Sequence, residues 1–270
     1  MKTRRASARR FRIMHRAHTL IGLALLLGAC GGKGGDGGEE TAPWAPLNDT
    51  GVTTCADGTQ TGLDCPVDGF PGQDAEYGRD VDFPDEADGR AGFSFVYLDA
   101  RGQAVDGSGD YACVQDRVTG LVWEVKTDDG LHDRDWTYTW YDGSNGTPGT
   151  DADTSCDQGP CDTHAFVQRV NDEALCGFTD WRLPHREELR GILDYGLFAD
   201  EGQRGLLAKA FFQPTPTNPP WSNARIWTAD RVASVTMRTW VIYNFNGVES
   251  AVYHDGQTRH AAILVRGGRP

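Results

Sequence analysis

The sequence of 270 residues predicts an α+β domain that is stapled by disulfide bonds. Two segments in the middle of the chain have the apolar spacing of helices, whereas the segments from residue 225 onward have the pattern of β-strands. Six of the seven cysteines follow residue 48, an even number that suits pairing in an oxidising compartment.

The two helices are predicted from their first residues and their apolar stripes. Asp162 can accept hydrogen bonds from the first turn of a helix that runs from residue 163 to 174. The second helix begins after Pro184. Apolar residues recur on one face of each helix: Phe166, Val170 and Ala174 in the first, and Leu189, Ile192 and Leu193 in the second.

Short apolar segments bounded by Gly, Pro and Asn predict the strands. These segments are 93–98, 119–125, 225–229, 239–245, 248–253 and 261–266. The pair Asn246-Gly247 separates two of them and is a strong signal for a tight hairpin. We expect the segments after residue 225 to form a C-terminal antiparallel sheet.

Residues 1–29 have the parts of a secretory signal peptide. Seven basic residues and no acidic residue accompany an apolar segment, 20–27, which is shorter than the roughly 20 residues of a membrane-spanning helix. Cys30 directly follows Leu-Gly-Ala, and this arrangement resembles a bacterial lipobox, whose cysteine is lipidated and becomes the mature N-terminus. The alternative is an ordinary signal peptide with an incidental cysteine.

Residues 30–47 comprise the lipidated cysteine and a glycine-rich tether that cannot form a core. Gly31 stands where an aspartate commonly retains lipoproteins at the inner membrane, so we expect attachment to the cell outer membrane or cell surface. Each acyl chain contributes about 0.8 kcal/mol per buried CH₂, and several chains on one cysteine give lasting attachment. Residues 48–270 are predicted to form one domain.

The chain is acidic. Removing the seven basic residues of the leader from the 26 in the chain leaves 19 against 39 acidic residues, a net charge of −20. Phosphate binding depends on clustered Lys and Arg, so this charge disfavours nucleic acid as a partner. For the same reason we expect any bound glycan to be neutral or bridged by calcium, and heparin-like polymers to be poor ligands.

The six cysteines of the domain leave a choice of pairings. Cys55 and Cys65 bracket a turn-rich loop, so we expect a local bridge. The other four, which allow three pairings, are Cys113, Cys156, Cys161 and Cys176. Because an intervening helix would hold Cys161 and Cys176 about 18 Å apart, we favour Cys156 with Cys161 and Cys113 with Cys176.

Ordered motifs from residue 48 to the C-terminus resemble the Lcl C-terminal domain family. The matching segments are 49–51, 72–77, 118–127, 135–141, 175–184 and 264–268. The resemblance implies a fold similar to the C-type-lectin-like superfamily. The family takes its name from a collagen-like bacterial adhesin whose terminal domain binds sulfated glycans.

The resemblance implies binding rather than catalysis, and it leaves two classes of function. One is an adhesin or glycan-recognition module, and the other is a structural or interaction component of the cell envelope. The superfamily also contains sulfatase-modifying enzymes, which would need reactive cysteines near the C-terminal sheet. No cysteine follows Cys176, so we predict no catalytic residue.

Trp136, Tyr138 and Trp140 alternate, so all three would lie on one face of a strand. Such a stripe can stack on sugar rings, which makes these residues the candidate ligand surface. The alternative is a stripe of core residues. Exposure of the three side chains would favour glycan recognition, and burial would favour a structural component.

Metal binding and local departures from the family pattern complete the expectations. No Cys-x-x-Cys or His-Glu-x-x-His motif occurs, and we predict no cofactor. The loop from Asp142 to Asp157 contains oxygen ligands that suit calcium; the alternative is a solvated loop without a metal.

The chain has no Gly-X-Y stalk, and His185 stands where the family has a helix-capping threonine. A local basic patch could be formed by Arg225, Arg231 and Arg238.

Overall fold

The computed structural model describes residues 48–83, 89–197, 206–213, 221 and 223–267. The chain divides into two compact units, residues 1–43 and 44–270. The predicted signal peptide, Cys30 and the tether lie outside the described residues. No helix in the described ranges has the length and apolar character needed to cross a membrane.

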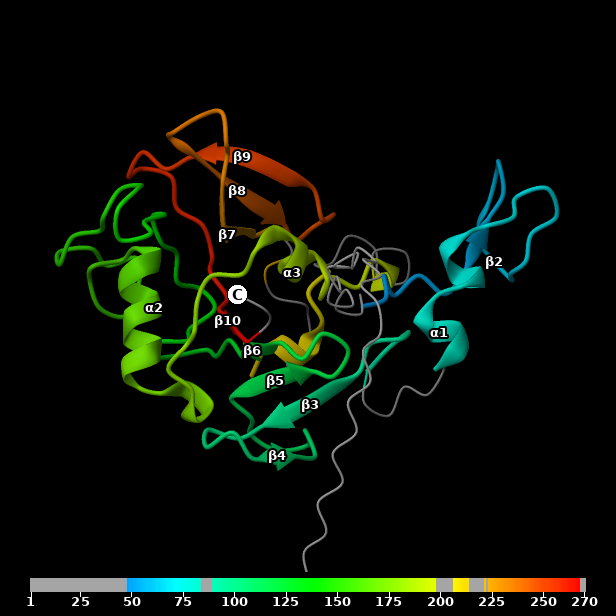
Figure 1. The fold of residues 1–270 in the computed structure, drawn as a ribbon, viewed down its shortest axis with the longest axis horizontal. Coiled ribbons are helices and arrows are strands. Elements are labelled where there is room, and N and C mark those ends of the chain that lie inside the picture. Colours follow the sequence, from blue (N-terminus) through cyan, green and yellow to red (C-terminus); the bar gives the residue numbers. More distant parts are fainter. Residues whose placement is uncertain (1–47, 84–88, 198–205, 214–220, 222, 268–270) are drawn as a thin grey trace, which may run out of the picture. The chain divides into compact units, whose positions relative to one another are not determined.

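A five-stranded antiparallel sheet has the strand order β10-β6-β5-β3-β4 (Figure 1). Its strands are β3 (Phe95–Leu98), β4 (Ala104–Val105), β5 (Cys113–Asp116), β6 (Val122–Glu124) and β10 (Val265–Arg266). Successive side chains of a strand point to opposite faces, and the neighbours Val122 and Trp123 belong to different hydrophobic clusters. The sheet is therefore buried on both faces around β5 and β6, whereas β4 at its edge is exposed.

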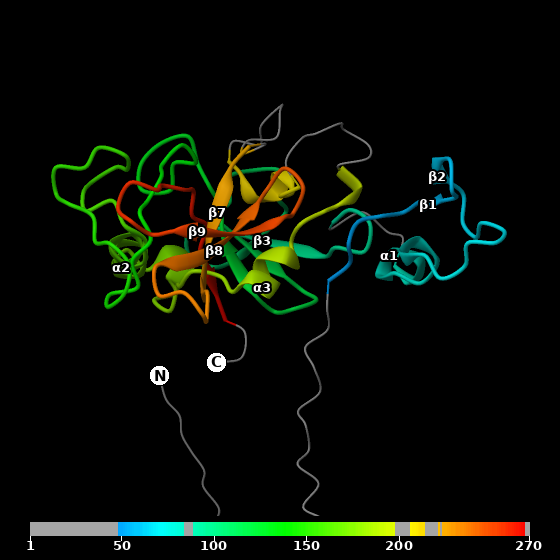
Figure 2. The ribbon, with the colours of Figure 1, turned by 90° about the horizontal axis from the view of Figure 1, so that it is seen from above.

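Both predicted helices are confirmed, and their apolar stripes face the core. Helix α2 (Thr163–Asp172) is capped by Asp162, which accepts a hydrogen bond from the backbone N–H of Ala165 at 2.8 Å. It ends earlier than expected, and Ala174 has a left-handed φ of 52°. Helix α3 (Arg186–Arg190) is short, and the two helices are well separated in both ribbon views (Figures 1 and 2). The fully buried stripe residues are Phe166, Val170, Leu189, Ile192 and Leu193.

A second antiparallel sheet contains β7 (Arg225–Arg231), β8 (Arg238–Tyr243) and β9 (Glu249–Tyr253) in that order. The predicted hairpin between β8 and β9 is present, but the expectation of a tight two-residue turn is wrong. The Tyr243 carbonyl accepts from the N–H of Gly247, so the loop spans residues 244–247. Asn244 leaves the strand because its buried side chain accepts from the Leu207 N–H and donates to the Trp221 carbonyl.

The last strand does not join the sheet of β7, β8 and β9, so the prediction of one C-terminal sheet is wrong for residues 261–266. Strand β10 pairs with β6, with Val265 opposite Trp123. Ala261, four residues earlier, bridges Ile226 in β7. The segment is buried because it touches both sheets. Its apolar pattern predicts burial, but the pattern alone does not show which sheet the segment joins.

Three disulfides staple the fold: Cys55–Cys65, Cys113–Cys176 and Cys156–Cys161, with Cα separations of 5.3, 6.5 and 5.6 Å. These are the pairs favoured from the sequence. The predicted disulfide-stapled α+β class is thereby confirmed.

The first bridge lies in an N-terminal segment that holds β1 (Cys55–Ala56), β2 (Thr61–Leu63) and α1 (Arg79–Asp82), and it encloses β2. In both ribbon views these elements lie apart from the two larger sheets (Figures 1 and 2). Residues at the ends of the segment tie it to the rest of the domain. Arg90 pairs with Asp194 at 2.7 Å, and the Tyr195 N–H donates to the Thr50 carbonyl at 2.7 Å.

Candidate functional site

The predicted ligand surface of Trp136, Tyr138 and Trp140 is wrong, because two of its three side chains lie in the core. Tyr138 and Trp140 are each 1% exposed. Trp140 donates from Nε1 to the Thr228 carbonyl at 2.9 Å, and Tyr138 stacks on Phe166 with ring centroids 4.6 Å apart. Trp136 is partly buried against the same cluster. The alternating aromatics therefore mark the inner face of an extended segment.

Tyr141, which follows this stripe, lines a hollow of about 220 Å³ at the surface. The hollow lies between the start of α2 and the residues just before α3, and we call it the α2–α3 hollow. Its apolar lining comes from Trp140, Val167, Leu183 and Ala229. Its polar lining comes from Tyr141, Asp142, Thr163, His164, Arg182 and His185.

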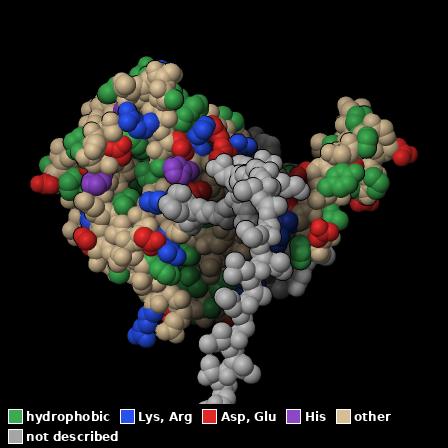
Figure 3. Space-filling view, viewed as in Figure 1, with side chains coloured by type: hydrophobic (Ala, Val, Ile, Leu, Met, Phe, Trp, Pro, Cys, Tyr) green, Lys and Arg blue, Asp and Glu red, His purple; other side chains and the backbone are tan. Residues whose placement is uncertain are grey.

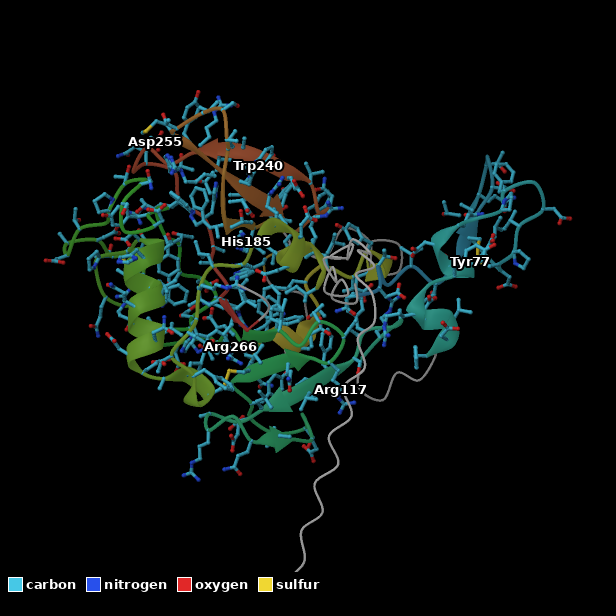
Figure 4. The ribbon with its side chains drawn as sticks, viewed as in Figure 1. Tyr77, Arg117, His185, Trp240, Asp255 and Arg266 are labelled. Atoms are coloured by element: carbon cyan, nitrogen blue, oxygen red, sulfur yellow. A yellow bond between two sulfur atoms is a disulfide. The ribbon has the colours of Figure 1, made fainter. Side chains whose placement is uncertain are left out.

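Two imidazoles reach the α2–α3 hollow from different elements. His164 stands in the first turn of α2 and packs edge-on against Tyr141, with ring centroids 5.8 Å apart. Within the described ranges, neither ring nitrogen of His164 has a hydrogen bond. His185 directly precedes α3 (Figure 4), and its Nδ1 lies 3.1 Å from Asp230. Gly143 allows the close approach, since a Cβ there would lie 3.0 Å from the His164 ring.

The charged groups of the α2–α3 hollow are already engaged. The Arg182 guanidinium donates to both carboxylate oxygens of Glu188 at 2.7 Å. Burial alone would raise the pKa of Asp142, but hydrogen bonds from Asn145 and Ser144 outweigh it and lower the pKa. A ligand that enters the hollow therefore meets imidazole nitrogens and apolar surface, and each charged group among the described residues of its lining already has a hydrogen-bond or ion-pair partner.

Two carboxylates of the loop from Asp142 to Asp157, those of Asp142 and Asp153, are used in separate local contacts. Asp142 accepts from the backbone N–H groups of Ser144 and Asn145, whereas Asp153 accepts from Ser155 and pairs with Arg259. Over the described ranges, no group of three or more His, Cys, Asp or Glu is arranged to hold a metal ion. Calcium binding by this loop stays a prediction.

The suggested basic patch of Arg225, Arg231 and Arg238 is wrong. Arg225 and Arg231 stand at opposite ends of β7, about 20 Å apart at the rise of a strand. Arg225 lies over the Tyr243 ring and Arg238 over the Tyr253 ring, at 5.6 and 4.2 Å from the centroids. On the face shown in Figure 3, basic and acidic side chains are interspersed.

A buried charged network beside β6 was not anticipated from the sequence. Glu124 is fully buried and accepts from Lys126 Nζ and from His132 Nδ1, both at 2.8 Å. Its other oxygen accepts from the Leu264 N–H at 2.8 Å, and His132 also binds Glu173. Burial alone would lower the pKa of His132, but its two carboxylate partners raise the pKa to about 9.

The spacing of Glu124 and Lys126 puts both side chains on one face of an extended chain, so that pair could have been found from the sequence. No local pattern points to His132 or Glu173, which come from a loop and from the end of α2. The network joins β6, α2 and the C-terminal segment, and none of its members lines the α2–α3 hollow. We therefore assign it to the stability of the fold.

A search of curated proteins and a search of solved structures found no match to the chain. The model of the Lcl C-terminal domain family matches residues 112–266. Strand β3 precedes this range but pairs with β5 inside it, so the folded unit begins before the match. Over more than half of its length, the chain belongs to the Lcl C-terminal domain family.

Proposed function

We propose that this protein is a lipid-anchored lipoprotein of the cell surface whose Lcl C-terminal domain recognises a neutral glycan through the α2–α3 hollow. The observation that carries the proposal is the lining of the hollow. An apolar floor lies beside two imidazoles, and the neighbouring ionic groups already have partners.

Sugar rings present apolar C–H faces and hydroxyl edges, and the α2–α3 hollow offers a partner for each. Val167 and Leu183 contribute apolar surface, and the edges of His164 and His185 can exchange hydrogen bonds with hydroxyls. Its volume is below the roughly 300–1,000 Å³ of pockets that enclose drug-sized ligands. The hollow therefore suits one sugar unit of a longer chain.

The charge of the protein supports a neutral rather than an anionic glycan at this place. Arg182, the cation of the hollow, is held in a two-point ion pair by Glu188. An anion would have to compete with that carboxylate, against the long-range repulsion of an acidic protein.

A second candidate, a structural or interaction component of the envelope, is favoured by two observations. Tyr138 and Trp140 are buried, which removes the exposed aromatic stripe. The N-terminal segment also exposes large apolar side chains, which are typical of contact surfaces. These side chains are Phe70, Tyr77, Val81 and Phe83, with exposed fractions of 46, 75, 52 and 57%.

The proposal is one of binding without catalysis. A sulfatase-modifying type of enzyme would require reactive thiols, and the six cysteines of the described residues are paired in disulfides. Labelling of the native chain with a thiol-reactive maleimide would test this directly, since a free catalytic thiol would react.

The test of glycan recognition is an array of neutral and anionic glycans probed with the full chain in detergent, with and without calcium. We expect binding to a neutral glycan, and Tyr141→Ala should weaken it at least tenfold because this ring lines the hollow. Tyr77→Ala is the matched control, since Tyr77 is exposed on the N-terminal segment (Figure 4) and should leave binding unchanged.

Two outcomes would contradict the proposal. If no glycan is retained, the second candidate, a structural or interaction component of the envelope, is favoured. The apolar N-terminal segment then becomes the surface to test. If Tyr77→Ala weakens binding as strongly as Tyr141→Ala, then recognition does not involve the α2–α3 hollow.

A further inference from the structure

A second hollow, of about 300 Å³, lies where the start of β7 meets residues 134–137 and 259–261. We call it the arginine hollow. The lining residues that matter here are Arg134, Asp135, Trp221, Arg225, Arg259 and His260. It shares no lining residue with the α2–α3 hollow.

Two of the three arginines in the arginine hollow are already neutralised. Arg134 pairs with Asp128, and Arg259 pairs with Asp153. Arg225 is different: it is exposed and lies over the Tyr243 ring, and within the described ranges no carboxylate lies at ion-pair distance from it. One guanidinium therefore brings a positive charge to the hollow without a carboxylate partner.

His260 brings a second group without a hydrogen-bond partner. Its Nε2 is buried and has no partner in the described part of the chain, while its ring packs on Trp227 with centroids 4.7 Å apart. Burial, together with the positive charge of Arg225, lowers the pKa of His260 to about 4. At neutral pH the ring is therefore uncharged, and a neutral imidazole can carry its proton on Nε2 and donate it.

We infer that the arginine hollow binds the carboxylate group of a small ligand, with Arg225 as the main contact and His260 Nε2 as a hydrogen-bond donor. The guanidinium presents two parallel N–H groups that match the two oxygens of a carboxylate. Since a single guanidinium lacks a carboxylate partner, a singly charged anion fits better than a doubly charged one. Asp135 at the same hollow adds repulsion against dense polyanions.

The remaining lining supports a ring-bearing ligand. Trp221 packs edge-on against Phe212 and donates from Nε1 to the Arg134 carbonyl, so its ring is fixed on the wall of the hollow. A fixed indole face can stack on a flat or sugar-like ring. A small carboxylate attached to such a ring, as in a uronic-acid monosaccharide, has the size and charge that the hollow accepts. This site is independent of the neutral-glycan proposal, because the two hollows have separate linings.

The probe is sodium D-glucuronate, titrated into the full chain in detergent and followed by calorimetry and by the NMR signal of the His260 ring. We expect saturable binding and a higher pKa for His260 in the complex, since a bound carboxylate offsets Arg225. D-glucose should not bind here, and sulfate should bind more weakly than glucuronate. Arg225→Gln should reduce the affinity for glucuronate at least tenfold.

Arg238→Gln is the matched control for Arg225→Gln. Arg238 also lies over a tyrosine ring of the same sheet, but it does not line the arginine hollow, so its variant should keep the original affinity. Absence of saturable binding, equal loss in both variants, or equal affinity for sulfate would each overturn the inference. Far-UV circular dichroism of the Arg225→Gln protein separates loss of the site from loss of the fold.

Discussion

The carboxylate of Asp230 in β7 caps helix α3 from outside the helix. Its Oδ2 accepts a hydrogen bond from the backbone N–H of Arg186 at 2.6 Å, and its Oδ1 lies 3.1 Å from His185 Nδ1. Glu188 supplies the other half of the cap, because its Oε2 accepts from the N–H of His185 at 2.8 Å. A distant strand thus supplies an acceptor for the N–H of the first helical residue, whereas a capping threonine at position 185 would accept from the N–H of the second or third residue.

Replacing Asp230 by Ala should lower the free energy of unfolding by about 1 kcal/mol, the typical value of a lost helix cap. Urea denaturation measures it. Adding His185→Thr to the Asp230→Ala protein should recover part of the loss, because the hydroxyl can accept from the N–H of Glu187 or Glu188. If the double variant is no more stable than Asp230→Ala, the external cap is not what Asp230 contributes.

The long-range disulfide should stabilise the fold more than the short one. Cys113 and Cys176 are 63 residues apart, and Cys156 and Cys161 are 5 apart. Chain-entropy arguments predict that changing the first pair to alanine lowers the free energy of unfolding by about 4 kcal/mol, and that changing the second pair lowers it by about 2 kcal/mol. Peptide mapping under non-reducing conditions checks the pairs, and a free thiol on Cys113 or Cys176 in the native chain would contradict them.

Stability should fall as the pH rises past neutrality, because of His132. Its pKa is raised from 6.5 to about 9 in the folded state, so its contribution is complete below pH 6.5 and is lost as the pH rises through 9. We expect a loss of roughly 3 kcal/mol in the free energy of unfolding across this window, measured by denaturation at several pH values. His132→Gln should remove this pH dependence, and an unchanged slope would show that another group titrates.

The full chain should not be retained on heparin at about 0.15 M salt without calcium. Polyanion binding needs several clustered cations, and Arg225 and Arg231 are held at opposite ends of β7. Affinity chromatography on heparin tests the expectation, with a salt gradient as the readout. Firm retention would mean that a basic surface exists that the described residues do not reveal.

Changing Cys30 to Ala should release the protein from the membrane fraction, because Cys30 is the lipid attachment site that we propose. Detergent phase partitioning of cells that express each form measures the shift into the aqueous phase. Cys55→Ala serves as the control for loss of a cysteine elsewhere, and its product should stay with the membrane. Membrane recovery that is the same for the Cys30 variant would contradict the anchor.

The helices and the disulfide pairs could be predicted because each depends on local geometry. Asp162 caps α2 as its position suggests, and the helix that separates Cys161 from Cys176 excludes their pairing. The sheet that the last strand joins could not be predicted, since an apolar segment fits equally well into either sheet. The stripe of Trp136, Tyr138 and Trp140 shows the same limit, because alternation reveals a shared face and not whether that face is covered.

The two hollows could not be predicted from the sequence, for a related reason. His164 and His185 are 21 positions apart, and Arg225 and His260 are 35 apart. Only the packing of α2 near the approach to α3, and of β7 against residues 259–261, brings each pair to one hollow.

The segment from Ala261 to Val265 has a consequence for the order of events in the cell. It bridges β7 at one end and completes the five-stranded sheet at the other, so it connects the two sheets. Among the segments that build the two sheets, this one is synthesised last. The two halves of the domain therefore cannot pack together before residues 261–265 have been synthesised, and until then the nascent domain stays open.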